Sequence, residues 1–188
     1  MNLSLSRTLT LAATTAAAVT MTLLMPATAS TATAAGTASG GLTFEQVPGA
    51  ASTMKYVKNK KSGKCLTVYR ASKANNATVN QYRCQGAANQ RWNMEWTGGL
   101  SYALRNANSN KCLTVHGASK ANGAAIDQYT CVGEANQAFY INISKPHKTE
   151  MRPSHTRKCL DVQGGSTADN GRVIQWSCNG RSNQSWSY

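Results

Sequence analysis

Side chains suited to reversible ligand binding recur in this sequence at an interval of 47 residues. Each copy carries an aromatic ring two residues before a cysteine and an Asn-Gln pair after it. The rings are Tyr82, Tyr129 and Trp176, and the pairs begin at Asn89, Asn136 and Asn183. One copy adds the carboxylate of Asp161. Rings stack on a ligand, amides donate and accept hydrogen bonds, and an ionised carboxylate accepts strong ones. The pattern therefore predicts binding rather than catalysis.

The interval of 47 residues extends to the whole unit. Laying residues 55–92 over residues 102–139 and 149–186 gives 11 identical columns out of 38. The identical columns include both cysteines of each copy and the glutamine of each Asn-Gln pair. The chain therefore contains a tandem triplication, in which each copy is one structural unit that packs against its neighbours.

The first 29 residues are typical of a secretory signal peptide. Arg7 is followed by an uncharged stretch from Thr8 to Met25, and Ala27-Thr28-Ala29 forms a cleavage site. We therefore predict a secreted, extracellular protein without a membrane span after cleavage. Residues 30–53 are rich in Ala, Ser, Thr and Gly, and are expected to form a flexible leader.

Six cysteines in an exported chain are expected to form disulfides, because the compartment is oxidising. Three equivalent repeats leave two kinds of pairing, either within each repeat or cyclically between neighbouring repeats. Pairing within a repeat is favoured, because it closes a short loop in every copy. The predicted pairs are Cys65–Cys84, Cys112–Cys131 and Cys159–Cys178. There is no Cys-x-x-Cys motif, and the three histidines are not in register. We therefore predict neither a metal site nor a cofactor.

Within each repeat, short apolar and aromatic runs alternate with Asn, Gly and Ser clusters, which is typical of strands and turns. The first repeat has such runs at Lys64–Tyr69, Ala77–Tyr82 and Gln90–Trp96. No apolar stripe of helical period follows the predicted signal peptide. Because a few short strands cannot bury a face alone, we expect the three copies to close into one barrel.

The repeated unit resembles the ricin B-chain type lectin repeat, which is also found in carbohydrate-binding modules of secreted bacterial glycosidases. The family's Gln-x-Trp signature stands here as Gln90-Arg91-Trp92, Gln137-Ala138-Phe139 and Gln184-Ser185-Trp186. The resemblance covers 134 of the 188 residues, from Lys55 to Tyr188. It implies a stand-alone, secreted bacterial member with an all-β fold, a β-trefoil over residues 54–188. Its repeats are expected at about 55–101, 102–148 and 149–188, with up to three sugar sites.

The third repeat matches the family's sugar site best. A pyranose offers hydroxyl groups and a weakly apolar C–H face, so a shallow site needs an aromatic ring and a few fixed polar groups. The resemblance assigns the acceptor to Asp161, the stacking ring to Trp176 and the amides to Asn183 and Gln184. A structural turn cap is the alternative role for Asp161.

The first two repeats depart from the family pattern, because threonine replaces the expected aspartate. We expect weaker sites there, or sites for a different sugar, since a hydroxyl is neutral. The residues assigned to these sites are Thr67, Tyr82 and Asn89 in the first repeat, and Thr114, Asp127, Tyr129 and Asn136 in the second. The glutamine that members often place four residues before the second cysteine is also shifted by one position. Asn80, Asp127 and Ile174 stand there instead, and the glutamine is expected to face the other way.

Large aromatic residues of the Gln-x-Trp signature, Trp92, Phe139 and Trp186, are expected in the core. Gln90 and Gln137 are expected to bond backbone groups, and Gln184 to do so in addition to binding sugar. His116 follows the Cys-Leu-Thr-Val run of the second repeat, so it is either a ligand contact or a solvated loop residue.

The charge modifies this interpretation. The chain has 20 Lys and Arg against 7 Asp and Glu, a net charge of +13. Basic residues gather at the starts of the first and third repeats, from Lys55 to Lys64 and from Lys145 to Lys158. Such runs are either solvated faces or a field that attracts polyanions.

We predict a monomeric, non-catalytic sugar-binding protein, whose partner is a polysaccharide or a cell-surface glycan bound mainly through the third repeat. One alternative is a basic trefoil that binds an anionic cell-wall polymer or another acidic polymer by charge. Another is an adaptor subunit whose leader binds a second secreted protein. An enzyme is disfavoured, because carboxylates are few and no Ser-His-Asp order repeats.

Overall fold

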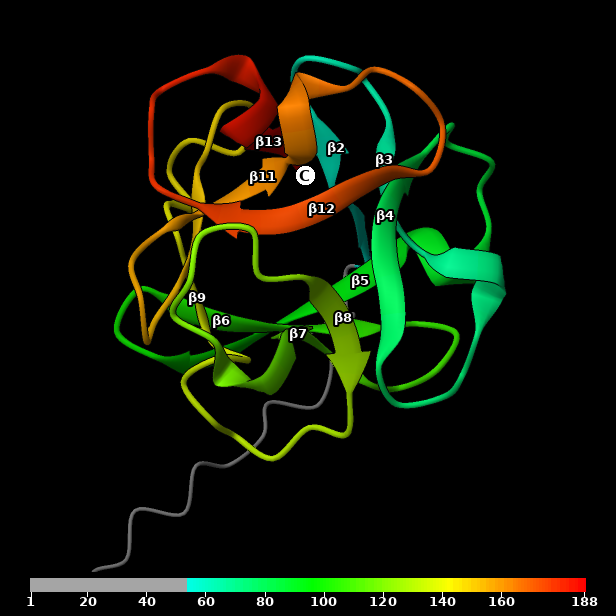
Figure 1. Ribbon diagram of the computed structural model, residues 1–188. Coiled ribbons are helices and arrows are strands. Elements are labelled where there is room, and N and C mark those ends of the chain that lie inside the picture. The colour runs from blue at the N-terminus through cyan, green and yellow to red at the C-terminus, as the bar shows by residue number, and fades with distance from the viewer. Residues whose placement is uncertain (1–53) are drawn as a thin grey trace, which may run out of the picture. The chain divides into compact units, whose positions relative to one another are not determined.

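The computed structural model describes residues 54–188, and it forms a β-trefoil (Figure 1). The predicted signal peptide and leader lie outside the described residues. The first repeat contains β1 (Lys55–Tyr56), β2 (Lys58–Asn59), β3 (Cys65–Val68), β4 (Ala77–Tyr82) and β5 (Arg91–Gly98). The second contains β6 (Ser101–Asn106), β7 (Cys112–Val115), β8 (Ile126–Tyr129) and β9 (Phe139–Ile141). The third contains β10 (Met151–Pro153), β11 (Cys159–Val162), β12 (Gly171–Trp176) and β13 (Trp186–Ser187).

Five short 3-10 turns complete the repeats. They are η1 (Tyr69–Ala71), η2 (Ala88–Gln90), η3 (His116–Ala118), η4 (Gln163–Gly165) and η5 (Ser182–Gln184). Turns η1, η3 and η4 follow equivalent strands, and each contains a residue with positive φ at its centre.

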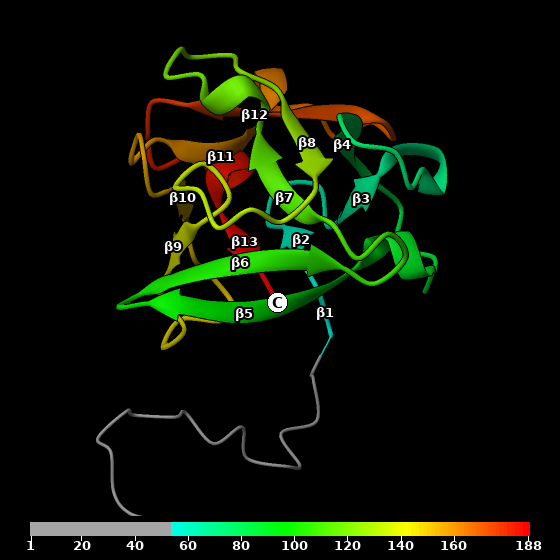
Figure 2. The ribbon, with the colours of Figure 1, turned by 90° about the horizontal axis from the view of Figure 1, so that it is seen from below.

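Three antiparallel hairpins, one from each repeat, form the cap. They are β3–β4, β7–β8 and β11–β12. Their second strands surround one axis, because β4 pairs with both β8 and β12, and Ala125 bridges to Ile174 (Figure 1). The long β5–β6 hairpin lies at the opposite end (Figure 2). Strand β6 also pairs with β9, and β13 pairs with β2, so the C-terminal strand contacts the first repeat.

The core is built from apolar residues at equivalent positions of the three repeats. Trp92, Phe139 and Trp186 are fully buried, as predicted. Trp92 Nε1 donates to Leu66 O and Trp186 Nε1 donates to Leu160 O, both at 3.0 Å. The indoles thus fill the core and also fasten the barrel to the first strand of the hairpin in their own repeat.

The three predicted disulfides are confirmed. Each joins the start of a hairpin strand to the loop after its partner, with a sequence separation of 19. The described cysteines leave no free thiol. Because the closed loops are equal in length, each disulfide reduces the entropy of the unfolded chain to a similar extent. Each is therefore expected to stabilise the folded state by about 3 kcal/mol.

The shifted glutamines lie in the seams between repeats, facing away from the hairpin surface that carries Asn80, Asp127 and Ile174. Gln175 Nε2 donates to Ser119 O at 2.7 Å and to Ala121 O at 2.9 Å, and Gln175 Oε1 accepts from Thr156. Gln81 and Gln128 make the equivalent bonds in the other two seams. All three side chains are fully buried. The expected reversal is therefore correct, and each glutamine joins two repeats.

Candidate functional site

Each repeat has a cavity beside its cap hairpin, between the 3-10 turn that follows the first strand and the Asn-Gln segment. We call these the first-, second- and third-repeat cavities, with volumes of about 390, 450 and 460 Å³. The third-repeat cavity is lined by Asp161, Ile174, Trp176 and Asn183, together with residues of η4. Ring, carboxylate and amide, which lie up to 22 residues apart in the sequence, thus meet in one hollow.

The strand ladder explains why Asp161 and Trp176 share this cavity. Asp161 on β11 pairs with Ile174 on β12, and Trp176 lies two residues further along β12. Alternation of side chains places Ile174 and Trp176 on the same face. Trp176 is 42% exposed, whereas Asp161 is buried. The cavity therefore has an open aromatic wall and a recessed carboxylate.

The Asp161 carboxylate is held by the Asn-Gln segment of its own repeat. Oδ2 accepts from Asn183 Nδ2 at 3.0 Å and from Gln184 Nε2 at 2.7 Å. Burial raises the pKa of this carboxyl, and the hydrogen bonds from Gln184 and Asn183 oppose that rise. Since both bonds go to Oδ2, Oδ1 is the oxygen left for a ligand. Gln184 itself is fully buried behind Asp161 and does not line the cavity.

In the first-repeat cavity Thr67, Tyr82 and Asn89 are all part of the wall. The Thr67 hydroxyl donates to Cys65 O at 2.7 Å and accepts from Gln90 Nε2 at 3.1 Å. Asn89 Nδ2 donates to Val68 O. Because the hydroxyl is engaged on both sides, the unpartnered oxygen of this cavity is the amide Oδ1 of Asn80, which is neutral, rather than a carboxylate oxygen.

The second-repeat cavity brings together Thr114, Tyr129 and Asn136, and adds Asp127 with His116. Thr114 bonds to Cys112 O and Gln137 in the same way as its first-repeat equivalent. Asp127 is buried, and its Oδ2 lies 2.6 Å from His116 Nδ1, whereas Oδ1 has no partner. Burial raises the pKa of Asp127, and the contact with His116 opposes that rise.

One pair of ladder positions gives the three cavities different polar groups. The pairs are Thr67 with Asn80, Thr114 with Asp127, and Asp161 with Ile174. A carboxylate stands on the first strand of the hairpin in the third repeat, on the second strand in the second repeat, and on neither strand in the first. Three equivalent scaffolds therefore present different polar groups.

Sequence comparison within a repeat misses the residues that one repeat contributes to another repeat's cavity. Lys61 of the first repeat lines the third-repeat cavity, Asn76 lines the second and Asn170 lines the first. Arg181, in the Asn-Gln segment of the third repeat, was also missed. In the sequence, Lys61 is one of several lysines in a basic run, and nothing there assigns it to a cavity.

The basic run of the third repeat lines a separate cavity of about 850 Å³ with Lys145, Lys148, Arg152 and Arg157. Arg152 pairs with Glu150, and the Arg157 guanidinium lies 3.6 Å from the centroid of the Tyr140 ring. The two basic runs thus line different cavities.

Within residues 54–188, Glu150, Cys159 and Cys178 form the one group of three potential metal ligands, but its two sulfurs are joined in a disulfide. In the same range no helix has the length and apolar character needed to cross a bilayer.

Comparisons with known proteins agree with this geometry. Residues 53–186 match the family described as ricin-type beta-trefoil lectin domain. The designed three-fold symmetric protein ThreeFoil is 35% identical, with a TM-score of 0.69, over 71% of this chain and 96% of that chain. An exo-beta-1,3-galactanase from Clostridium thermocellum is 33% identical, with a TM-score of 0.69, over 71% of this chain but 29% of the galactanase.

A more distant structure shares the fold. The Macrolepiota procera ricin B-like lectin, solved in complex with lactose, is 21% identical with a TM-score of 0.60, over 72% of this chain and 94% of that chain. No curated protein matches the sequence.

Proposed function

Because the chain belongs to the ricin-type β-trefoil lectin family, we propose that it is a non-catalytic carbohydrate-binding protein that binds a polysaccharide or cell-surface glycan mainly through the third repeat. The observation that carries this proposal is the third-repeat cavity itself. It combines an open indole, a recessed carboxylate with one free oxygen, and an amide. These are the groups that a sugar ring requires.

Each group has a distinct role in the proposed complex. The Trp176 ring stacks on the C–H face of a pyranose. Asp161 Oδ1 accepts hydrogen bonds from hydroxyl groups, more strongly than a neutral acceptor would. Asn183 Nδ2 donates to Asp161 Oδ2 and to Val162 O, so the side-chain oxygen Oδ1 of Asn183 is the atom available to the sugar. Gln184 acts as a positioning residue that holds Asp161 in place.

The first two cavities bind more weakly or bind other sugars. Tyr82 and Tyr129 line them as stacking rings, but each has a threonine in place of Asp161. Three sites on one rigid unit gain avidity on a repeating polymer, because the second and third contacts become intramolecular.

Export and domain organisation form part of the same proposal. Residues 1–29 have the composition of a signal peptide, and three disulfides fit an oxidising compartment. The mature protein is then a secreted monomer with a leader of residues 30–53 and one lectin domain.

The test is retention on a panel of insoluble polysaccharides. Asp161→Asn keeps one amide oxygen for Asn183 and Gln184 but turns an amide donor toward the cavity, and Trp176→Ala removes the ring. Both variants should lose retention, and free sugar should elute the parent protein. Trp96→Ala is the matched control, because Trp96 is 62% exposed and lines none of the three cavities.

Binding of acidic polymers by charge is the second candidate, and the basic cavity around Lys145 and Lys148 favours it. Retention that moderate salt abolishes, and that neither Asp161→Asn nor Trp176→Ala changes, would establish this candidate and overturn the lectin proposal. The adaptor hypothesis concerns residues 30–53, which lie outside the described part of the chain.

A further inference from the structure

The third-repeat cavity contains a lysine that comes from the first repeat. Lys61 lies in the loop between β2 and β3, and it lines the cavity together with Asp161 and Trp176. A Cβ atom built on Gly165, in η4, would lie 2.6 Å from Lys61 Nζ. The ammonium group therefore occupies the space that a side chain at residue 165 would take, beside the turn that forms the cavity wall.

The other two repeats fill this space differently. Ala71 and Ala118 stand at the position of Gly165, and Asn108 and His155 stand at the position of Lys61. Asn108 Nδ2 donates to Ala71 O at 2.8 Å, and His155 Nε2 lies 3.1 Å from Ser119 O. In those repeats the side chain from the neighbouring repeat is bonded to the backbone near the 3-10 turn. In the third repeat, a glycine in the turn and a lysine in the neighbour fit each other and bring an ammonium group to the cavity.

The third-repeat cavity also holds a second cation. Arg181 lines it, where the equivalent positions carry Ala87 in the first repeat and Glu134 in the second. Within residues 54–188, neither Lys61 nor Arg181 has a carboxylate within 4.0 Å. The described part of the chain therefore does not neutralise these two cations by ion pairing.

The charges of the three cavities consequently differ. The first has Arg70 and no carboxylate, and the second has Asp127 and Glu134 with His116. The third combines one carboxylate, Asp161, with two cations. A ligand of the third cavity meets both a hydroxyl acceptor and an unpaired positive charge, which a neutral sugar leaves unused.

We infer that the third-repeat cavity selects an acidic saccharide, one that bears a carboxylate, sulfate or phosphate group. This inference rests on the proposed function and specifies its ligand. Lys61 and Arg181 pair with the anionic group, Trp176 stacks on the ring, and Asp161 accepts from a hydroxyl. Because Asp161 repels an anion, the acidic group lies at the η4 edge of the cavity, where the Lys61 ammonium group is.

The probes are matched pairs of small sugars, which avoid multivalent attraction to the basic protein. Galactose, glucose and mannose are each compared with their uronic acids, and galactose is also compared with its 6-sulfate and 6-phosphate. Affinity is measured by NMR titration of the full protein at low salt. We expect at least one acid to bind about two- to fivefold more tightly than its parent, the gain typical of an exposed ion pair. The sulfate and phosphate arms identify the anionic group.

Two variants test the residues that carry the inference. Lys61→Asn installs the residue that the second repeat has at this position, Asn108, and should remove the preference for the acid, measured as the ratio of the affinities for the acid and its neutral parent. Lys60→Asn removes the same charge from an exposed neighbour that does not line the cavity, and should leave the preference intact.

The glycine supplies an independent test. Gly165→Ala should displace the Lys61 ammonium group and reduce the preference for the acid over its neutral parent, as Lys61→Asn does. Alanine is accommodated here, since Ala71 and Ala118 adopt the same positive φ. Gly164→Ala is the control, because Gly164 also has positive φ (+64°) but a Cβ there meets nothing within 4 Å.

Two outcomes would overturn the inference. One is that no acid binds more tightly than its parent, and the other is that Lys60→Asn weakens acid binding as much as Lys61→Asn does, which would indicate only a long-range field. Failure of the lectin proposal is recognised separately, by retention on polysaccharide that Asp161→Asn and Trp176→Ala do not change.

Discussion

At the scale of single residues, burial distinguishes the carboxylates of this protein. Burial raises the pKa of Asp161 and Asp127, whereas the hydrogen bond from Lys64, together with Arg83, lowers the pKa of Asp169. A raised pKa means that the fold disfavours the ionised form. The ionised Asp161 oxygen on which the proposed sugar binding depends is therefore kept at a cost in stability.

The opposite shifts predict opposite dependences of stability on pH. The contribution of Asp161 is largest below the ordinary Asp pKa of about 3.9 and is lost as pH rises through its raised pKa. That of Asp169 is present above the ordinary value and is lost as pH falls through its lowered pKa. Relative to the parent, the Tm of Asp161→Asn should therefore rise between about pH 3 and pH 7, and that of Asp169→Asn should fall. Differential scanning fluorimetry across this range measures both, and parallel curves would contradict the assignment.

Protonation of Asp161 also predicts how binding responds to acid. Acidification should weaken retention on polysaccharide at a higher pH than an ordinary aspartate would allow, because its burial raises the pKa. Retention measured between about pH 3 and pH 7 tests this prediction, and a loss confined to the ordinary aspartate range near about pH 3.9 would contradict it.

At the scale of elements, strand alternation assigns the two faces of each cap hairpin to different tasks. On β12, Ile174 and Trp176 face the cavity, whereas Gln175 between them faces the seam with the second repeat. The site and the contact between repeats are thus built by adjacent residues of one strand. A one-residue shift of register would disrupt both.

Removal of a seam glutamine should destabilise the whole domain. Gln175→Ala leaves the carbonyl groups of Ser119 and Ala121 without this donor and Thr156 without its acceptor, so we expect a loss of about 2–4 kcal/mol. Gln85→Ala is the control, because Gln85 is exposed, and should change stability by no more than about 0.5 kcal/mol. Urea unfolding measures both variants, and equal costs would show that the seam bonds contribute little.

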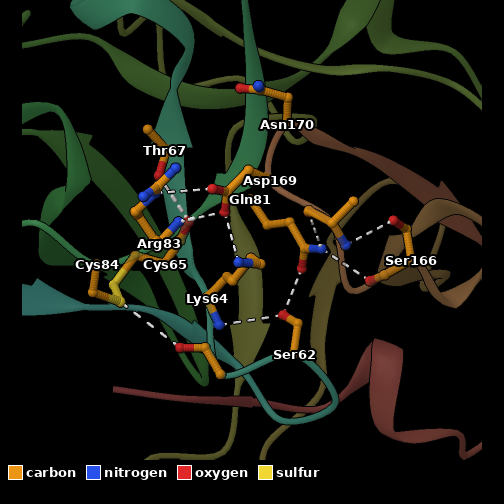
Figure 3. Close-up of polar contacts among 12 residues, drawn as sticks. Ser62, Lys64, Cys65, Thr67, Gln81, Arg83, Cys84, Ser166, Asp169 and Asn170 are labelled. Atoms are coloured by element: carbon orange, nitrogen blue, oxygen red, sulfur yellow. Dashed lines mark hydrogen bonds and ion pairs between the residues drawn. A yellow bond between two sulfur atoms is a disulfide. The ribbon is translucent and has the colours of Figure 1, made fainter.

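At the scale of the whole molecule, closure of the trefoil brings the third repeat against the first. Asp169 accepts from Lys64 at 2.6 Å and from the Arg83 side chain at 2.9 Å, across the seam drawn in Figure 3. The equivalent residues Asn75 and Asn122 accept only from backbone and hydroxyl donors in the other two seams. Among these three equivalent positions, ion pairs therefore form only at the seam that joins the two ends of the repeat array.

Charge at this seam predicts a dependence on salt. Asp169→Asn retains an oxygen for the Arg83 amide but loses both ion pairs, so its Tm should be lower than that of the parent at low ionic strength. The difference should shrink as sodium chloride is raised to about 0.5 M, because salt screens exposed charges. Glu134→Gln is the control, since Glu134 is an exposed carboxylate without an ion pair within residues 54–188. A difference that salt does not change would argue against an electrostatic origin.

Much of the fold was determined by the sequence alone. The 47-residue interval predicted three equivalent units and the pairing of their cysteines within each repeat, because every copy folds as the same structural unit. The family resemblance and the size of the side chains predicted the burial of Trp92, Phe139 and Trp186. Several residues that the resemblance assigned to one repeat's site do meet in one cavity, since hairpin register brings them together locally, although Arg181 of the same repeat was missed. Asp161 and Trp176 are the clearest case.

Only the tertiary structure decided which side chains of a neighbouring repeat line each cavity. Lys61 is separated from Asp161 by 100 residues, and no repeat pattern connects them. Its place in the cavity depends on the closure of the trefoil and on the missing side chain of Gly165. The structure also placed Gln184 behind Asp161 rather than in the cavity wall. A repeat in sequence encodes local hairpin geometry, whereas the charge of each cavity results from packing between repeats, which symmetry in the sequence does not reveal.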